Sequence, residues 1–268
     1  MTIALQSSVV YGPISSRRLG TSLGINILPT EVKFCLSNCI YCQYGWTDLR
    51  QMRSLKLQAA GPLLKEIEKS FSFHSGEGLK PDSITFSGNG EPTLHPEFGK
   101  LVRGVKKLRD RFFPGVPVAA LSDSSRVHLQ EVRQALCELD RQYMKLDAGD
   151  RETYLAINNP AINYVNFDFN QILEGLHELP RLTLQSLFLS APVDNSNGPA
   201  LRNWLNAVQK LSPQEVHLYT VDRPSADHRV RPAPWPRLLE IEKLVRDSTA
   251  ANTFVFSCQA HSSRDPGE

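Results

Sequence analysis

Long apolar runs are missing from this sequence. Nowhere do eighteen apolar residues stand together, and the opening MTIALQSSVVYGPISS has no cationic start followed by an apolar stretch. A membrane-spanning helix and a secretory signal are therefore not expected. An excess of charge is missing too, because the formal net charge is +2, so bulk charge neither implies nor excludes nucleic acid. We expect a cytoplasmic protein that does not associate with a membrane.

Cysteine is scarce, yet it is concentrated in one place. The chain holds five cysteines in 268 residues, and Cys35, Cys39 and Cys42 fall within eight residues. Disulfides are rare in a reducing compartment, so such a group indicates metal binding or catalysis. Thiolates favour iron-sulfur clusters, zinc or copper(I). Three thiolates leave one position of a four-coordinate centre open, which favours a cluster with an open site.

Zinc stays open as an alternative. A structural zinc ion needs a fourth protein ligand, and neither Cys137, in a predicted helix, nor Cys258, beyond the last predicted strand, is obviously placed to supply it. His74 and His95 are the remaining candidates. This alternative describes a non-catalytic zinc or iron-sulfur binding module with a structural or RNA-associated role. A weaker hypothesis, a hydrolase with Glu91 as general base beside His95, leaves the cysteines unexplained.

The hydrophobic pattern predicts parallel strands linked by helices. Short apolar or β-branched runs alternate with segments of helical periodicity. The predicted strands are 22–28, 83–88, 116–122, 142–148, 183–190 and 216–221. The predicted helices are 63–71, 98–108 and four that begin near 127, 170, 201 and 238. We predict the α/β class, an open partial (β/α)6 TIM-like barrel with parallel strands.

One domain is expected over residues 1–258, with a cluster loop at 29–47 and a disordered tail at 259–268. The apolar run 253–257 is a candidate edge strand. In such barrels ligands bind at the carboxyl ends of the strands. Polar segments follow the predicted strands there, namely the cysteine loop, GNGEP, SDSS, LDAGDR, SAPVDN and TVDRP. The sequence therefore predicts a single site at that end.

The motifs resemble a known superfamily. CLSNCIYC, with Tyr41 directly before the last cysteine, resembles the signature of the radical S-adenosylmethionine (SAM) superfamily. The run YGPISSRRLGTSLGINILP, with FSGNGEPTLHP, KLDAGD, AINNP and YTVDRP, is similar to a stand-alone group of iron-sulfur oxidoreductases distantly similar to wyosine-base tRNA synthesis enzymes.

This resemblance implies a [4Fe-4S] cluster on Cys35, Cys39 and Cys42, with SAM chelating the fourth iron. An electron from a reductant such as flavodoxin or ferredoxin would cleave SAM to methionine and a 5'-deoxyadenosyl radical that abstracts hydrogen from a substrate.

The resemblance also implies a cofactor site. The residues expected to bind SAM are Tyr41, Gly88, Asn89, Gly90, Glu91, Ser122 and Arg151. Glu91 would pair with the SAM ammonium, Ser122 would contact the ribose and Arg151 the carboxylate. Asp123 stands where relatives often have asparagine, and an aspartate accepts hydrogen bonds but cannot donate them. Without the cysteines, GNGEP fits a tight turn equally well.

Substrate contacts are expected from Asp147, Tyr219 and Arg223. Arg223 is the expected substrate anchor because a guanidinium at a strand end can bind a carboxylate or phosphate through two parallel hydrogen bonds. Acidic residues nearly cancel the basic ones, so a small molecule, peptide or partner protein is favoured over tRNA. Arg17 and Arg18 precede the first predicted strand, which places them at its amino end in a structural or partner-binding role unless the N-terminal segment folds over the barrel mouth.

Overall fold

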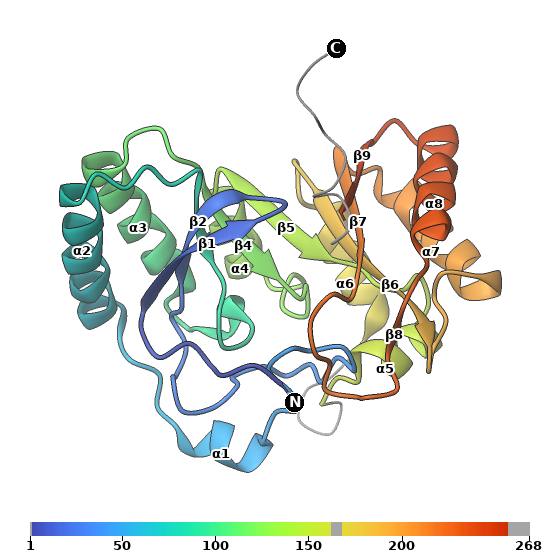
Figure 1. Cartoon of the computed structure of the whole chain (residues 1–268), viewed down its shortest axis with the longest axis horizontal. Helices are drawn as coiled ribbons and strands as arrows, with labels where there is room; N and C mark the ends of the chain where they lie inside the picture. The colour runs from blue at the N-terminus through green and yellow to red at the C-terminus, as the bar shows by residue number, and fades with distance from the viewer. Residues whose placement is uncertain (1, 162–167, 257–268) are drawn as a thin grey trace.

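A curved, mostly parallel sheet is the scaffold of the protein (Figure 1). The computed structural model describes residues 2–161 and 168–256. The strands are β1 (Val10–Ser16), β2 (Gly20–Ile25), β3 (Ser83–Phe86), β4 (Val118–Ser122), β5 (Arg141–Lys145), β6 (Thr183–Ala191), β7 (Glu215–Thr220), β8 (Arg231–Pro232) and β9 (Asn252–Phe256). Their order is β1-β2-β3-β4-β5-β6-β7-β9, with β8 paired to β6. Strands β2 to β7 and β9 are parallel, whereas β1 and β8 are antiparallel to their partners.

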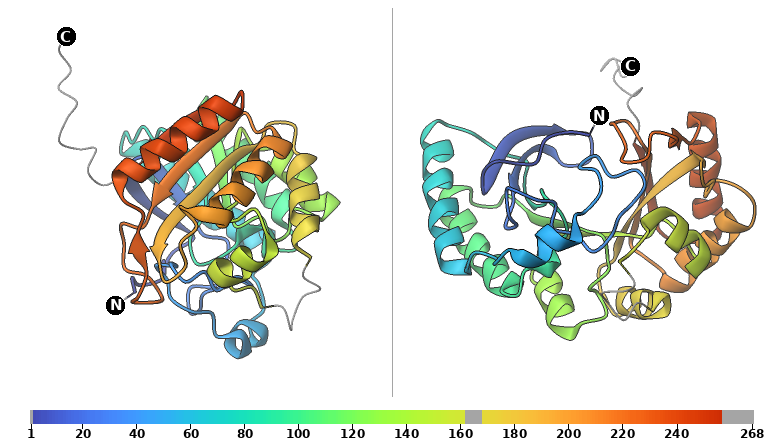
Figure 2. Two further views of the ribbon diagram at one scale, coloured as in Figure 1. Left: turned by 90° about the vertical axis from the view of Figure 1, so that its right-hand side faces the viewer. Right: turned by 90° about the horizontal axis from the view of Figure 1, so that it is seen from below.

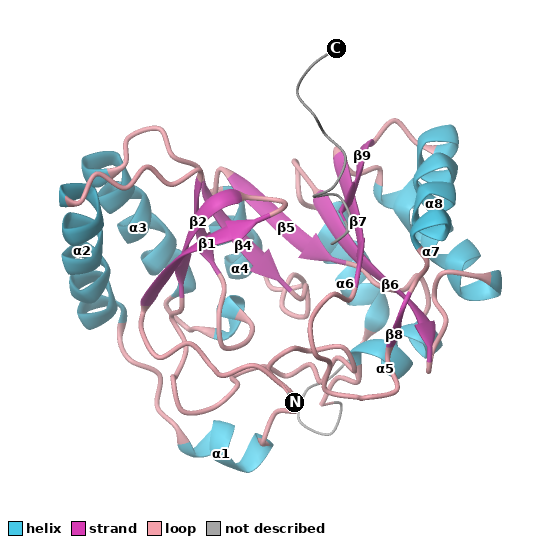
Figure 3. Cartoon of the chain, viewed as in Figure 1, coloured by secondary structure: helices cyan, strands magenta, loops and turns pink. Residues whose placement is uncertain are grey.

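Helices surround the sheet on its outer side (Figures 2 and 3). They are α1 (Leu49–Ser54), α2 (Ala60–Gly76), the 3-10 turn η1 (Pro92–Leu94), α3 (Phe98–Phe112), α4 (Gln130–Cys137), α5 (Arg151–Asn158), α6 (Phe169–His177), α7 (Gly198–Leu211) and α8 (Trp235–Ser248). In α3, Leu101, Val102 and Val105 are fully buried, as their spacing predicts for a helix with one apolar face. No helix within the described ranges is long and apolar enough to cross a membrane.

The predicted architecture is confirmed. The six predicted strands correspond to β2 through β7, and the candidate edge strand is β9, which pairs with β7. Helices α1 and α5 were not predicted, and neither was β1. The predicted tail 259–268 lies outside the described residues.

An N-terminal hairpin of β1 and β2 corrects one expectation. The ring of Tyr11 on β1 lies directly over Gly24 on β2, where an added Cβ would come within 2.1 Å of the ring. The Tyr11 hydroxyl is 2.6 Å from the Ser87 hydroxyl at the end of β3. At the tip of the hairpin, the Arg18 guanidinium donates to the side chain of Gln185 on β6. The hairpin therefore crosses the inside of the barrel, and Arg18 is not confined to the amino end of its strand.

The core fills the space between sheet and helices. Trp204 on α7 is fully buried, and its ring meets that of Phe188 on β6 edge to face at 4.9 Å. Its indole N–H donates to the carbonyl of Leu146 at 2.9 Å. This bond ties α7 to the residue just past β5, where the polar segment of that strand begins, so the core and the strand ends are held together.

Candidate functional site

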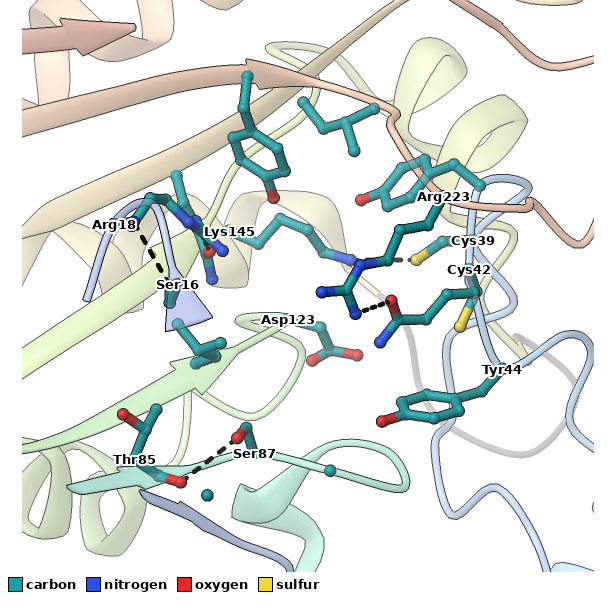
Figure 4. Close-up of a pocket in the computed structure, with 18 of the residues that line it drawn as sticks. Ser16, Arg18, Cys39, Cys42, Tyr44, Thr85, Ser87, Asp123, Lys145 and Arg223 are labelled. Atoms are coloured by element: carbon teal, nitrogen blue, oxygen red, sulfur yellow. Dashed lines mark hydrogen bonds between the residues drawn. The ribbon is translucent and has the colours of Figure 1, made fainter. Parts of the chain in front are cut away.

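A cavity of about 500 Å³ lies inside the barrel, and it is lined by residues of the cysteine loop, the N-terminal hairpin and strands β3 to β7. Cys35, Cys39 and Cys42 all line it. Cys35 and Cys39 are buried and Cys42 is half-buried, and none of the three is in a disulfide. Figure 4 shows Cys39 and Cys42 side by side on one wall of this cavity. The structure therefore brings the three predicted ligands to one place.

Backbone hydrogen bonds on two sides fix the cysteine loop. On one side, Phe34 N–H donates to the carbonyl of Asn89 at 2.7 Å, in the segment after β3. On the other side, Ile40 N–H donates to the carbonyl of Ile157 at 2.9 Å, at the end of α5. Helix α5, which the sequence analysis missed, thus serves as one support of the loop. Both of these supports are main chain, so these two bonds do not depend on side-chain rotamers.

Two positions of the GNGEP segment require glycine for steric reasons. Gly90 has φ +150°, and a Cβ there would lie 1.9 Å from the carbonyl oxygen of Phe34. Gly88 has φ +119°, and a Cβ there would lie 2.9 Å from Asn26. Only glycine fits such conformations without strain. Gly88 and Gly90 line the cavity, and their contact with SAM stays a prediction.

Asn89, between these glycines, is fully buried and is not among the residues that line the cavity. Its amide oxygen accepts from Gln6 N–H at 2.7 Å, and its amide nitrogen donates to the carbonyls of Gln6 and Pro29 at 2.9 Å each. Asn89 therefore joins the N-terminal segment to the start of the cysteine loop. The prediction that it binds SAM is not supported by this placement.

The Cys39 sulfur accepts two hydrogen bonds. Lys145 Nζ donates to it at 3.1 Å and Asn158 Nδ2 at 3.5 Å. Burial alone would lower the pKa of Lys145, but Cys39, Tyr41 and acidic neighbours raise this pKa well above its usual value. Lys145 is therefore a cation, and its ammonium donates a hydrogen bond to the Cys39 sulfur. Lys145 is the last residue of β5, a position that the sequence analysis left within the strand and did not count among the site residues.

Cys35 has a different environment. Its sulfur accepts from Ser37 N–H at 3.4 Å and lies 3.5 Å from Oδ2 of Asp123. Burial, and then the charge of Asp123, raise the pKa of the Cys35 thiol well above its usual value. A cationic centre bound at this wall would reverse that effect, since thiols that ligate a metal are deprotonated.

The donor set fits a cluster better than zinc. Within the described residues, no three His, Cys, Asp or Glu side chains are grouped so as to hold one metal ion. Each cysteine of a cluster binds a separate iron, so three thiols can lie further apart than ligands of one ion. His95, a candidate fourth zinc ligand, bonds instead to the carbonyl of Gln58 at 2.9 Å, and His74 is on α2 outside the cavity lining. Cys137 is on α4, also outside the lining, and Cys258 lies outside the described residues.

Glu91 is part of a buried network. It is 2% exposed, and its carboxylate accepts from Thr93 N–H at 3.0 Å, the Thr93 hydroxyl at 2.6 Å, the Ser122 hydroxyl at 3.0 Å and Asp123 N–H at 2.5 Å. Burial, and then the charge of Asp123, raise the pKa of Glu91 to about 8, against the opposing effect of these bonds. Glu91 and Ser122 both line the cavity. Their contacts with SAM stay predictions.

The carboxylate of Asp147 is occupied by hydrogen bonds within the protein. It is 1% exposed, and it accepts hydrogen bonds from the Tyr41 hydroxyl, from Asn158 Nδ2 at 3.0 Å and from Leu187 N–H at 2.9 Å. Tyr41 lines the cavity but Asp147 does not. Asp147 thus holds Tyr41 in place, and its predicted contact with substrate finds no support in this geometry. Arg151 is exposed in the first turn of α5 and outside the cavity lining, so the structure does not bring it to the site.

Two arginines line the cavity at different places: Arg18 lies away from Cys39 and Cys42, whereas Arg223 lies close to them (Figure 4). Arg18 Nη1 donates to Oε1 of Gln185 at 2.7 Å, and its guanidinium carbon lies 4.7 Å from the centre of the Tyr219 ring. Arg223 Nη1 donates to Oε1 of Gln43 in the cysteine loop at 3.0 Å. Tyr219 and Arg223 both line the cavity, as predicted. The sequence analysis did not place Arg18 here, because the hairpin that carries it was not foreseen.

Comparison with known proteins identifies the family. A family model described as the Radical SAM superfamily matches residues 32–190. The chain belongs to the radical SAM superfamily. A UPF0026 protein of Helicobacter pylori is 31% identical over 225 residues, which are 81% of this chain and 68% of that protein. A protein of Brachyspira hyodysenteriae named GTPase Obg is 30% identical over 231 residues, which are 85% of this chain and 32% of that protein. The chain thus spans about a third of that relative.

Solved structures of radical SAM enzymes share the fold. A radical SAM methyltransferase from Sphaerobacter thermophilus has a TM-score of 0.63 and 12% identity, over 88% of this chain and 65% of that one. Archaeal TYW1 has a TM-score of 0.54 and 16% identity, over 85% of this chain and 72% of that one. The superfamily and the partial barrel predicted from the motifs are both confirmed.

Proposed function

We propose that this chain binds one [4Fe-4S] cluster through Cys35, Cys39 and Cys42 and uses SAM to start radical chemistry on an organic substrate. The observation that carries the proposal is that all three thiols line one cavity, whose lining, within the described residues, contains no other cysteine and no histidine. When bound, the cluster supplies the electron that cleaves SAM to methionine and a 5'-deoxyadenosyl radical, which removes hydrogen from the substrate.

The chain's own residues have separate tasks in this proposal. The backbone at Gly88 and Gly90 leaves room for SAM, and Glu91 with Ser122 forms a fixed polar surface beside it. Lys145 donates a hydrogen bond to the Cys39 sulfur, and such a bond to a ligand sulfur would tune the cluster. Cys35 and Cys39 are 7% and 5% exposed, so the protein excludes most water from these ligands. The reductant is proposed to be a flavodoxin or ferredoxin, in the cytoplasm.

A small molecule, peptide or protein segment is proposed as substrate, in preference to tRNA. The cavity of about 500 Å³ is in the range of small-molecule sites. Arg229, one of the basic residues considered for RNA, already binds Asp227 through two of its nitrogens, at 2.7 and 3.2 Å to Oδ2. Its charge is thus offset within its own loop. Titration of bulk tRNA at rising salt tests this point, because tight binding with a steep salt slope would favour RNA.

The decisive experiment is anaerobic reconstitution followed by measurement of iron, sulfide and 5'-deoxyadenosine. The expected product is a brown protein that releases 5'-deoxyadenosine slowly with a strong reductant even without substrate. Cys39→Ala should lose the iron, whereas Cys137→Ala, outside the cavity, should keep it. A colourless protein with one zinc that resists exchange would support the binding-module alternative instead.

A further inference from the structure

Arg18 is not among the residues proposed to bind the cluster or SAM, yet several contacts fix the position of its side chain. Its partner Gln185 is 5% exposed, and the amide nitrogen of Gln185 donates to the carbonyl of Tyr143 at 2.9 Å. This second bond fixes the orientation of the amide, so its oxygen faces Arg18. The Tyr219 ring, 4.7 Å away, supports the other face of the guanidinium. Figure 4 shows Arg18 on the side of the cavity away from Cys39 and Cys42.

The partners of Arg18 hold it without neutralising it. A glutamine and a tyrosine ring are uncharged, so the positive charge of Arg18 keeps its full value inside the cavity. Asp222, an acidic residue on the same wall, forms an ion pair with Arg17, the neighbour of Arg18 in the hairpin. The bond to Gln185 uses one of the five N–H donors of a guanidinium. The remaining donors suit a bidentate oxyanion.

Arg223 is also held by an uncharged partner. It donates to Gln43, another neutral amide, and it also lines the cavity. Two guanidinium groups are therefore positioned by glutamines, whereas Arg17 on the same hairpin is neutralised by a carboxylate. An arginine needed only to tie the hairpin to the barrel would gain more from a carboxylate partner, as Arg17 does.

We propose that Arg18 binds an oxyanion of the substrate, a carboxylate or a phosphate. This inference rests on the proposed function, because it concerns the substrate of that site. The anionic group would lie beside Arg18, and the part of the substrate that loses hydrogen would point toward the cysteines, where Arg223 is a second cation. The substrate class is thus an organic acid or phosphate ester rather than a neutral compound.

The test is calorimetric titration of the full-length reconstituted protein with inorganic phosphate and, separately, with succinate. Arg18→Gln should weaken binding of at least one probe by about tenfold or more, because a charge-assisted pair is lost. Arg18→Lys should give an intermediate loss of affinity, since lysine keeps the positive charge but not the planar pair of N–H donors of a guanidinium. The matched control is Arg202→Gln, exposed on α7 outside the cavity lining, which removes the same charge and should change binding less than about twofold. The probe whose binding Arg18→Gln weakens more identifies the class of anion, phosphate or carboxylate.

Several outcomes would overturn the inference. They are unchanged binding in Arg18→Gln, equal losses in Arg18→Gln and Arg202→Gln, or no binding of either probe by the wild type. Should Arg18→Gln fail to fold, as judged by circular dichroism, the comparison of Arg18→Lys with Arg202→Gln decides. Release of 5'-deoxyadenosine without substrate is measured in parallel in the wild type and in Arg202→Gln, where it should be the same. Loss of that release in the wild type, with anion binding intact, would refute the proposed function and leave the anion site standing.

Discussion

Replacement of Gly90 by alanine tests how the cysteine loop is held. A methyl group there would lie 1.9 Å from the Phe34 carbonyl oxygen, which belongs to main chain and cannot rotate away. The two segments must separate, and this breaks the bonds from Phe34 N–H to Asn89 and from Glu91 N–H to Phe34, at 2.7 and 3.1 Å. A non-glycine residue in this φ region costs about 1–3 kcal/mol, and each lost bond about 0.5–1.5 kcal/mol, so we expect a loss of about 2–6 kcal/mol.

Gly78 provides a matched control. It has φ +77° just after α2, and a Cβ there would meet nothing within 4 Å. Gly78→Ala therefore adds left-handed strain alone, about 1–2 kcal/mol. Urea unfolding of the cluster-free chain measures both variants, and iron content after reconstitution measures the loop. Gly90→Ala should lose iron although every cysteine is intact. If the two variants lose the same stability and keep the same iron, the contact with Phe34 does not hold the loop.

Three further predictions follow from the site. Lys145→Met removes a cationic donor from Cys39 and should shift the midpoint potential of the cluster to more negative values in a redox titration, so an unchanged potential would argue against the bond. The folded-state pKa of Glu91, about 8, lies above its usual 4.5, so the folded chain binds more protons between these values and its free energy of unfolding should fall as the pH rises from 4.5 to 8. Glu91→Gln should flatten this slope in urea titrations of the cluster-free chain, and an equally steep slope would assign it to other groups. Gly24→Ala should push the Tyr11 ring from its place and cost about 1–3 kcal/mol in the same assay, whereas a loss near zero would show that the ring moves freely.

The parallel strands and the cysteine loop could be predicted because their signals are local. Apolar runs of strand length and a tight cysteine spacing can be read within a few residues. Strand β1 was not predicted because its sequence VYGPISS contains Gly12 and Pro13 and is largely exposed. Proline is tolerated in edge strands, and β1 is the first strand in the sheet order, so the weak pattern reflects its position.

The side chains at the site could be assigned only in part. Asp147 was expected to meet the substrate because it follows a strand, but Tyr41, which is 106 residues away, occupies it instead. Arg18 was expected at the amino end of a strand, and its true partner, Gln185, is 167 residues away. In both cases the direction of the side chain was set by a distant partner, which no local pattern contains.

The contacts of the N-terminal hairpin also bear on the order of folding. Strands β2 to β6 each pair with the next strand along the chain, so this part of the sheet can grow by successive loop closures. The bonds of Arg18 to Gln185 and of Arg223 to Gln43 join residues 167 and 180 positions apart, and closing such loops has the larger entropic cost. These bonds should form last and break first, while the paired strands stay intact. The tip of the hairpin, which carries Arg18, would then separate from β6 before the sheet itself unfolds.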